Sequence, residues 1–229
     1  MEECRRLALQ GCLEGTIVSA NFQNAGRGRF SRSWISPRGE NLQISILIKP
    51  SLQQLPQANM SAALAISDSV EEITEQKGQI KWPNDVEVLG KKVAGILVES
   101  ELTDKTRSFA IIGIGLNVNL QPKLHREIAD KATSLVEICN SYVSRAQTLR
   151  VLIHHLNFYY GLVKDNISLL EMWESRLNTL GKRINLSTPS QTVSGIAESV
   201  NEDGTINIRL DNGTVFTGSS GEVTIERYS

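Results

Sequence analysis

The sequence is poor in the residues that build disulfide frameworks and metal sites. Its three cysteines, Cys4, Cys12 and Cys139, are odd in number and form no CxxC pair. This pattern argues against both a disulfide scaffold and a zinc site. His154 and His155 are adjacent on an expected helix, so they point in different directions and do not form a ligand pair. We expect the cysteines to be reduced and to pack as small hydrophobic residues.

Long apolar runs and an excess of charge are also missing. No apolar run is long enough to span a bilayer, and the first six residues lack the apolar core of a signal peptide. Lysine and arginine together number 24 against 25 acidic residues, which gives a formal net charge of −1. No global basic field therefore draws the protein to nucleic acid. We expect a cytoplasmic globular protein that binds neither membranes nor nucleic acid.

Positive charge is instead concentrated in one stretch, residues 25–34, which reads AGRGRFSRSW. Glycine loses the most backbone entropy on ordering and arginine is rarely buried without a partner, so this stretch predicts an exposed, mobile loop. Guanidinium groups match carboxylate and phosphate oxygens, and glycines let a ligand approach backbone N–H groups closely. Taken alone, the stretch fits a phosphate-binding loop and an RGG-like nucleic-acid tether equally well.

Hydrophobic periodicity predicts a chain of alternating strands and helices. Helices are expected over residues 2–9, 58–76, 145–164 and 168–180, with a short one opened by Ser134. Strands are expected over residues 16–20, 42–48 and 80–86. Residues 88–99 are expected to form a hairpin about Gly90 and Lys91 that continues as a buried strand, and a further strand is expected over 110–119. Gly113 and Gly115 lie two residues apart, on one face of the last of these strands. The missing side chains leave room there for a ligand or for a closely packed helix.

The composition changes at Gly181, after which five short β-type runs follow one another. Turn signals separate them at residues 202–204 and 211–213, which read EDG and DNG. This pattern predicts a small all-β barrel that is too small to be stable alone and that docks on the preceding domain. We therefore expect two domains, residues 1–180 and residues 181–229.

Four separated blocks together resemble the biotin protein ligases, enzymes that activate biotin with ATP and attach it to a lysine of a carrier protein. The blocks are QNAGRGRFSRSW at 23–34, KWPND at 81–85, KKVAGILVE at 91–99 and IGIGLNVN at 112–119. They occur in the order of that family, and the small β domain lies where the family has its SH3-like domain. The resemblance therefore covers essentially the whole chain.

The resemblance implies a fold and a two-step reaction. The fold is α+β, with a mixed sheet and flanking helices similar to the class II aminoacyl-tRNA synthetases, followed by a small SH3-like β-barrel. In the reaction, biotin, ATP and Mg²⁺ give biotinyl-5'-adenylate and pyrophosphate, and a lysine then takes the biotinyl group. The implied partner is a biotin carboxyl carrier protein, such as a subunit of acetyl-CoA carboxylase. Both a monomer and a homodimer are compatible with the sequence.

The resemblance also assigns roles to individual residues. It implies that Lys92, Arg27, Arg29 and Asp85 are catalytic. Lys92 would reach the biotin carboxylate and the adenylate oxygens, and Asp85 would lie near the acceptor lysine or the metal ion. The residues expected to contact biotin or adenylate are Gln23, Gly26, Arg27, Gly28, Arg29, Trp34, Lys92, Gly95, Gly113, Gly115 and Asn117. Trp34 would close the loop over the ligand, and no side chain is assigned to the metal.

One departure from the family pattern concerns the start of the chain. Family members carry a strand with a Ser/Thr-Thr-Asn motif, which binds the biotin ureido ring, just before the helix that matches residues 2–9. The sequence starts at Met1, inside or just after that motif. Three alternatives stay open: the true start lies upstream, the chain is truncated, or the first strand and part of the biotin pocket are missing. In the last two cases we expect weakened biotin binding, because lost buried hydrogen bonds are costly. The family's optional DNA-binding domain is likewise not expected.

Three other interpretations compete with an active biotin ligase. The first is a truncated, catalytically impaired chain that binds biotin or adenylate. The second is a related lipoate ligase, which the KWPND and GRGR blocks disfavour. The third is an RNA-binding protein, which the net charge of −1 disfavours.

Overall fold

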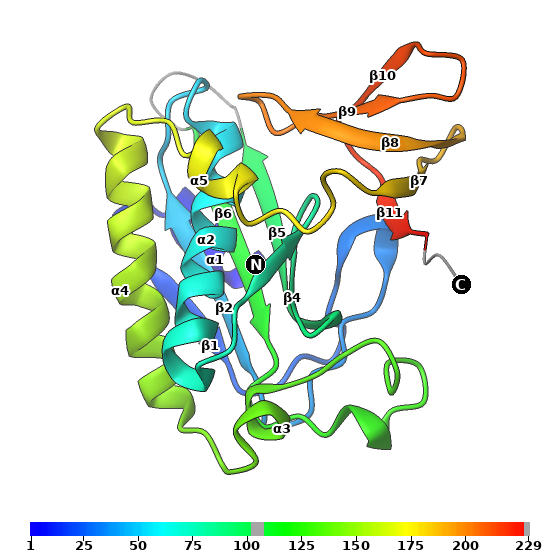
Figure 1. The fold of residues 1–229 in the computed structure, drawn as a ribbon. Coiled ribbons are helices and arrows are strands. Elements are labelled where there is room, and N and C mark those ends of the chain that lie inside the picture. Colours follow the sequence, from blue (N-terminus) through cyan, green and yellow to red (C-terminus); the bar gives the residue numbers. More distant parts are fainter. Residues whose placement is uncertain (102–107, 227–229) are drawn as a thin grey trace.

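Two β-sheets organise the chain in this computed structural model, which describes residues 1–101 and 108–226 (Figure 1). The larger sheet has six strands in the order β1-β2-β6-β5-β4-β3, and the smaller has five in the order β10-β9-β8-β7-β11. All paired strands are antiparallel. The larger sheet is mixed only through two isolated parallel bridges, Ile80–Leu177 and Lys92–Ala132.

The elements follow the predicted order closely. The larger sheet contains β1 Ile17–Ala20, β2 Leu42–Ile48, β3 Gln79–Lys81, β4 Asp85–Val88, β5 Lys91–Glu101 and β6 Phe109–Leu116. The helices are α1 Glu2–Leu9, α2 Leu55–Thr74, α3 Leu135–Cys139, α4 Arg145–Lys164 and α5 Leu170–Glu174. The smaller sheet contains β7 Arg183–Ser187, β8 Thr192–Val200, β9 Ile206–Arg209, β10 Val215–Gly218 and β11 Glu222–Ile225.

Helices cover both faces of the larger sheet. Helix α2 packs on one face and α4 packs against α2, while α1 lies on the opposite face (Figure 1). Strand β2 is consequently buried along all seven of its residues. Side chains alternate between the faces of a strand, so Ile44 and Ile46 join the α2 core whereas Leu47 packs toward Cys4 of α1. No helix in the described part of the chain is both long and apolar enough to cross a bilayer.

The smaller sheet shares its core with the larger one. Ile184, Leu186, Ile206 and Ile208 belong to the same buried cluster as the α2 face of the larger sheet. Trp82 links the two, because it is 1% exposed and its indole Nε1 donates a hydrogen bond to the carbonyl oxygen of Gly204 at 2.9 Å. Trp82 is therefore a packing residue.

The predicted helix over residues 168–180 is mostly wrong, since α5 ends at Glu174. The chain after α5 runs beside the edge strand β3 and uses its backbone groups there. Ile80 N–H donates to the carbonyl of Arg176 at 2.8 Å, and Asn178 N–H donates to the carbonyl of Ile80 at 2.9 Å. Pairing with a free sheet edge thus outweighs the helical periodicity of this segment.

The close approach of β8 to β9 at Gly195 gives a test of the smaller sheet. A Cβ at this position would overlap the carbonyl oxygen of Arg209. We expect Gly195→Ala to lower the free energy of unfolding by about 1–3 kcal/mol, the usual range for overpacking. Denaturant unfolding measures this change. Gly161→Ala is the control, because no atom lies within 4 Å of its added Cβ. Equal stability of the two variants would contradict this arrangement of β8 and β9.

Candidate active site

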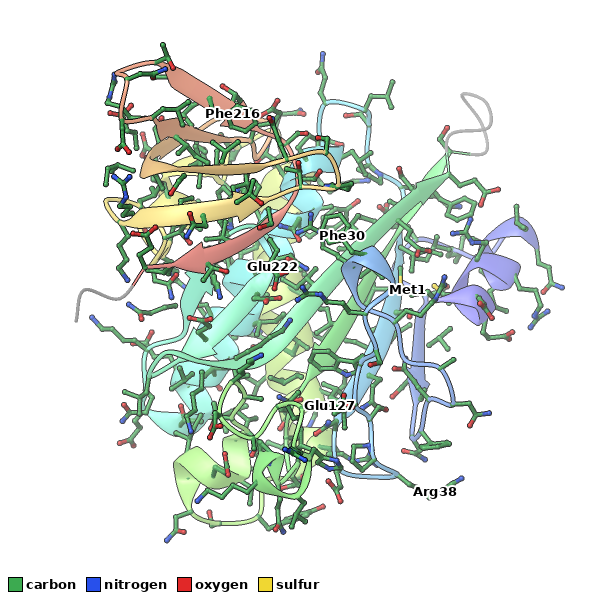
Figure 2. All side chains as sticks on the ribbon, turned by 90° about the vertical axis from the view of Figure 1, so that its right-hand side faces the viewer. Met1, Phe30, Arg38, Glu127, Phe216 and Glu222 are labelled. Atoms are coloured by element: carbon green, nitrogen blue, oxygen red, sulfur yellow. The ribbon has the colours of Figure 1, made fainter. Side chains whose placement is uncertain are left out.

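A cleft of about 900 Å³ opens on the α1 face of the larger sheet, where the smaller sheet adjoins it. Its floor is formed by β2, β6, β5 and β4, and its walls by residues 23–34, which we call the arginine loop, the 120–132 segment and β11. Four residues that line the cleft, Met1, Phe30, Glu127 and Glu222, are labelled in Figure 2 and lie around it on one side of the molecule. Residues distant in sequence therefore meet at one site.

The centre of the floor is a row of four residues, one from each of four adjacent strands. Gln43 of β2 pairs with Gly115 of β6, Gly115 pairs with Gly95 of β5, and Gly95 pairs with Asp85 of β4. Directly opposed residues point to the same face, and adjacent strands lie about 4.8 Å apart, so the row is roughly 14 Å long. We call it the glycine row. Its two central positions have no side chain, which leaves a flat strip of floor.

A pair of opposite charges lies at the Asp85 end of the glycine row. The Nζ atom of Lys92 is 2.7 Å from Oδ1 of Asp85, in an ionic contact that lacks the alignment of a hydrogen bond. The backbone of Lys92 is fixed on both sides, because its N–H donates to the carbonyl of Lys131 and its own carbonyl accepts from Thr133 N–H, each at 2.9 Å. Both charged side chains line the cleft. The ammonium group of Lys92 is therefore held next to any ligand that binds on the floor.

Polar residues at the opposite end of the cleft were missed in the sequence analysis. Gln43 is 3% exposed, and neither its Oε1 nor its Nε2 has a hydrogen-bond partner. Ser45, 6% exposed, lies two residues further along β2, opposite Gly113. The sequence pattern that could have identified these two residues is the alternation in residues 42–46, LQISI. Its polar residues fall on one face of an otherwise apolar strand.

The indole of Trp34 lies on the central glycines of this row. An added Cβ at Gly115 would be 2.5 Å from Cε2 of Trp34, and one at Gly95 would be 3.3 Å from its Cζ3. The indole Nε1 is buried without a hydrogen-bond partner, and Nζ of Lys92 lies 5.5 Å from the ring centroid. Trp34 was predicted to close the loop over a ligand. In this structure its ring occupies the floor itself, so a ligand that uses this floor must displace it.

The arginine loop is folded back on itself by backbone hydrogen bonds. Trp34 N–H donates to the carbonyl of Gly26 at 2.8 Å, and Gly28 N–H donates to the carbonyl of Arg32 at 2.7 Å. An added Cβ at Gly26 would overlap the carbonyl oxygen of Trp34. Gly26 therefore allows the two limbs of the loop to meet, and it is the one predicted contact residue that does not line the cleft.

Two arginines of this loop have different environments. Arg29 Nη1 donates to Oδ1 of Asn84 at 3.1 Å and to the carbonyl of Gly221 at 3.3 Å. Burial lowers the pKa of the Arg29 guanidinium, an effect that the nearby carboxylates partly offset. Arg27 is more exposed, and its Nη2 lies 3.8 Å from Glu2 and 4.0 Å from Glu99. Arg29 is thus held within the site, whereas Arg27 stands at its mouth.

The loop also contacts the smaller sheet through its third arginine. Both terminal nitrogens of Arg32 donate to the carboxylate of Glu222, the first residue of β11. In Figure 2, Phe30 of the loop and Glu222 of β11 lie near one another. Bidentate Arg–carboxylate pairs fix orientation as well as distance, so β11 positions the loop over the cleft.

The remaining predicted residues also line the cleft, but Asn117 is already engaged. Gln23, Gly28 and Gly113 are part of the lining. Asn117 is 3% exposed, its Nδ2 donates to the carbonyl of Thr133 at 3.0 Å, and its Oδ1 accepts from Nδ2 of Asn41. The amide of Asn117 therefore holds the turn that precedes α3.

Comparison with known proteins identifies the family of this chain. Residues 6–117 match the biotin/lipoate A/B protein ligase family, and residues 179–225 match the biotin protein ligase C-terminal domain. The biotin protein ligase from Aquifex aeolicus in complex with biotin and ATP has a similar structure, with a TM-score of 0.81 and 32% sequence identity. That match covers 98% of this chain and 94% of the other. The chain belongs to the biotin protein ligase family.

Two further relatives are longer than the segment that this chain matches. The bifunctional ligase/repressor BirA of Bacillus subtilis is 34% identical over 212 residues, which are 90% of this chain and 65% of that protein. The biotin–[acetyl-CoA-carboxylase] ligase of Mycobacterium tuberculosis is 29% identical over 226 residues, which are 95% of this chain and 82% of that one. The chain thus spans a little under two thirds of the Bacillus subtilis relative.

The position of Trp34 on the glycine row can be tested by fluorescence. In Gly115→Ala the new methyl group would overlap the indole, so we expect Trp34 to leave the floor and its emission to shift to longer wavelength. The other two tryptophans, Trp82 and Trp173, are each 1% exposed and should be unaffected. Gly28→Ala is the control, because the nearest atom to its added Cβ is 3.7 Å away. An unchanged spectrum in Gly115→Ala would show that the indole lies elsewhere.

Proposed function

We propose that this chain is an ATP-dependent biotin ligase. It would convert biotin and ATP to biotinyl-5'-adenylate and pyrophosphate, and then transfer the biotinyl group to a lysine of a biotin carboxyl carrier protein. The observation that carries the proposal is the glycine row, a side-chain-free floor with the positioned cation Lys92 at one end, in a member of this family. The relative from Aquifex aeolicus was solved with both biotin and ATP.

The chemistry explains why cations surround the floor. In the first step a biotin carboxylate oxygen attacks the α-phosphorus of ATP, and the bond from that phosphorus to the bridging oxygen breaks to release pyrophosphate. Both reactants are anions, so the site must neutralise and align them. Lys92 stabilises the charge that develops on the α-phosphoryl oxygens. Arg29 holds the phosphates inside the site, and Arg27 binds at the mouth.

In the second step the carrier lysine attacks the carbonyl carbon of the mixed anhydride. The incoming ammonium first loses a proton to solvent, and its neutral amine forms the C–N bond. The bond from the carbonyl carbon to the phosphate oxygen breaks, AMP leaves, and the nitrogen releases a second proton to solvent as the amide forms. Asp85 lies 2.7 Å from Lys92 and keeps its ammonium group directed at the floor. The same carboxylate lies beside the position of the anhydride, where it attracts the incoming lysine ammonium.

Mg²⁺ would be held at this site mainly by the phosphates of the nucleotide. Among the described residues, no group of three or more histidine, cysteine, aspartate or glutamate side chains comes together to hold an ion. Mg²⁺ keeps several waters and is commonly bound by one or two carboxylates together with substrate phosphates. When bound, the ion neutralises phosphate charge. The charged contacts to the reactants come from the arginine loop and Lys92.

The proposal extends to the organisation and setting of the chain. Residues 1–180 form the catalytic domain. Residues 181–229 form a second domain, which supplies the wall of the cleft that holds the arginine loop. We place the enzyme in the cytoplasm, where ATP and a carboxylase carrier subunit are available.

The first experiment is biotin-dependent exchange of radiolabelled pyrophosphate into ATP, followed by labelling of a biotin carrier domain. We expect exchange that requires biotin and is not supported by lipoate. Exchange that requires lipoate would assign the lipoate ligase reaction instead. Binding of biotin and ATP without any exchange would indicate the impaired chain that the sequence analysis considers.

The role of Lys92 is tested with its neighbour as the matched control. Removal of one group that stabilises transition-state charge typically costs about 100-fold to 1000-fold in rate. We expect Lys92→Gln to slow adenylate formation by about this factor while the unfolding midpoint changes little, because the side chain lies at the surface of the cleft. Lys91→Gln removes the same charge one residue away, at a position outside the cleft lining, and should retain normal rates. Equal effects of the two substitutions would refute the assignment.

A further inference from the structure

The arginine loop is attached to the rest of the chain by two stems, residues 21–22 after β1 and residues 35–41 before β2. The stems contact each other near the surface. Gly39 N–H donates to the carbonyl oxygen of Asn21 at 2.9 Å, and the guanidinium carbon of Arg38 lies 5.3 Å from the ring centroid of Phe22. Figure 2 shows Arg38 at the edge of the molecule. These two contacts join the stems to each other rather than to the body of the protein.

Arg145, the first residue of α4, contacts both stems with one guanidinium group. Its Nη2 donates to Oδ1 of Asn21 in the first stem at 3.0 Å, and its Nη1 donates to the carbonyl oxygen of Asn41 in the second stem at 3.2 Å. Asn41 is 1% exposed, and its Oδ1 accepts from Val118 N–H at 3.2 Å. A guanidinium presents its donors in a fixed, planar fork. We call this pair of hydrogen bonds the clamp, because it holds both stems against α4.

The position of Arg145 is unfavourable for its own helix. The N-terminus of a helix carries a partial positive charge, so a cation in the first turn is disfavoured. The first turn of α4 contains no acidic residue that could offset this effect. Both oxygens that Arg145 binds belong to neutral groups, so the clamp contains no ion pair. What arginine supplies here is therefore the reach and the geometry of its fork, which connects two segments of the chain at once.

The other end of the arginine loop is fixed to the smaller sheet. Arg29 donates to the carbonyl oxygen of Gly221, and Arg32 binds the carboxylate of Glu222. The loop is thus held by β11 at its tip and by α4 at its stems. Arg145 is not part of the cleft lining, so it can act on a reactant only through the loop.

We infer that Arg145 is a positioning residue that holds the arginine loop closed over the cleft. Without the clamp the stems separate from α4, so the loop opens more often while the fold is kept. The consequence for catalysis rests on the proposed function. A reactant that needs the closed loop binds only to the closed fraction of the protein, and its apparent affinity falls with that fraction. Lys92 and the glycine row are unchanged, so the chemical step keeps its rate.

Limited trypsin digestion of the ligand-free protein tests the clamp, because Arg27, Arg29 and Arg32 are themselves cleavage sites. Cleavage requires local opening, and its rate follows the population of the open form. Arg145→Gln should be cut within residues 27–32 about tenfold faster than the wild type, the scale of one hydrogen bond to a charged group. Cleavage elsewhere and the unfolding temperature should be unchanged, because local opening does not require global unfolding. Mass spectrometry of the fragments assigns each cut.

Three further variants separate the fork from its charge. Arg150→Gln removes the same charge from an exposed position on α4 and should be cut at the wild-type rate. Arg145→Lys keeps the charge without the planar fork, so its loop should be cut nearly as fast as in Arg145→Gln. Wild-type protection in Arg145→Lys would show that charge suffices and would overturn the clamp. Asn21→Ala should also raise cleavage, and its effect combined with Arg145→Gln should be smaller than the product of the two single effects.

Pyrophosphate exchange then measures the catalytic consequence. In Arg145→Gln we expect the KM for ATP to rise about threefold to tenfold, whereas kcat stays within about twofold of the wild type. A fall in kcat at unchanged KM would overturn positioning through the loop. Wild-type cleavage of the loop in Arg145→Gln, or faster cleavage throughout the chain, would overturn it as well. Faster cleavage confined to the loop, in a protein without biotin-dependent exchange, would support the clamp and contradict the ligase proposal instead.

Discussion

The antiparallel register of four strands is the constraint on which the rest of this site depends. It aligns Gln43, Gly115, Gly95 and Asp85 in one row across β2, β6, β5 and β4. A slip of one residue in any of these pairings would turn that member of the row to the opposite face and into the α2 core. The apolar side chains that alternate with the row are held in that core, so burial on one face enforces the geometry of the cleft on the other.

The second dependence is the link between the arginine loop and the smaller sheet. Arg29 reaches the carbonyl of Gly221 and Arg32 binds Glu222, so the loop is held by β11 as well as by its own backbone. The loop in turn positions Trp34 on the glycine row. In the proposed function the small sheet is therefore part of the active site. Its effect on catalysis acts through the loop, because the smaller sheet donates no side chain to the floor.

Much of this arrangement could be predicted from the sequence, because local residue patterns indicate most of the helices, strands and turns. The turn glycines, the capping Ser134 and the periodicity of residues 145–164 gave the right elements, and four motif blocks gave the family. The helix expected over 168–180 was wrong because a distant strand edge competes for its backbone, which no local pattern reveals. Gln43 was missed for a similar reason. Its polarity was visible, but its unpaired state depends on neighbours contributed by β6 and the arginine loop.

The central claim is that one strip of floor, now covered by Trp34, holds the activated intermediate with Lys92 at its phosphate. A crystal structure with a non-hydrolysable analogue of biotinyl-5'-adenylate tests this most directly. The account predicts phosphoryl oxygens within hydrogen-bond distance of the Lys92 ammonium group and the indole of Trp34 lifted from the floor. An analogue bound elsewhere in the cleft, with the indole still on Gly115 and Gly95, would contradict it.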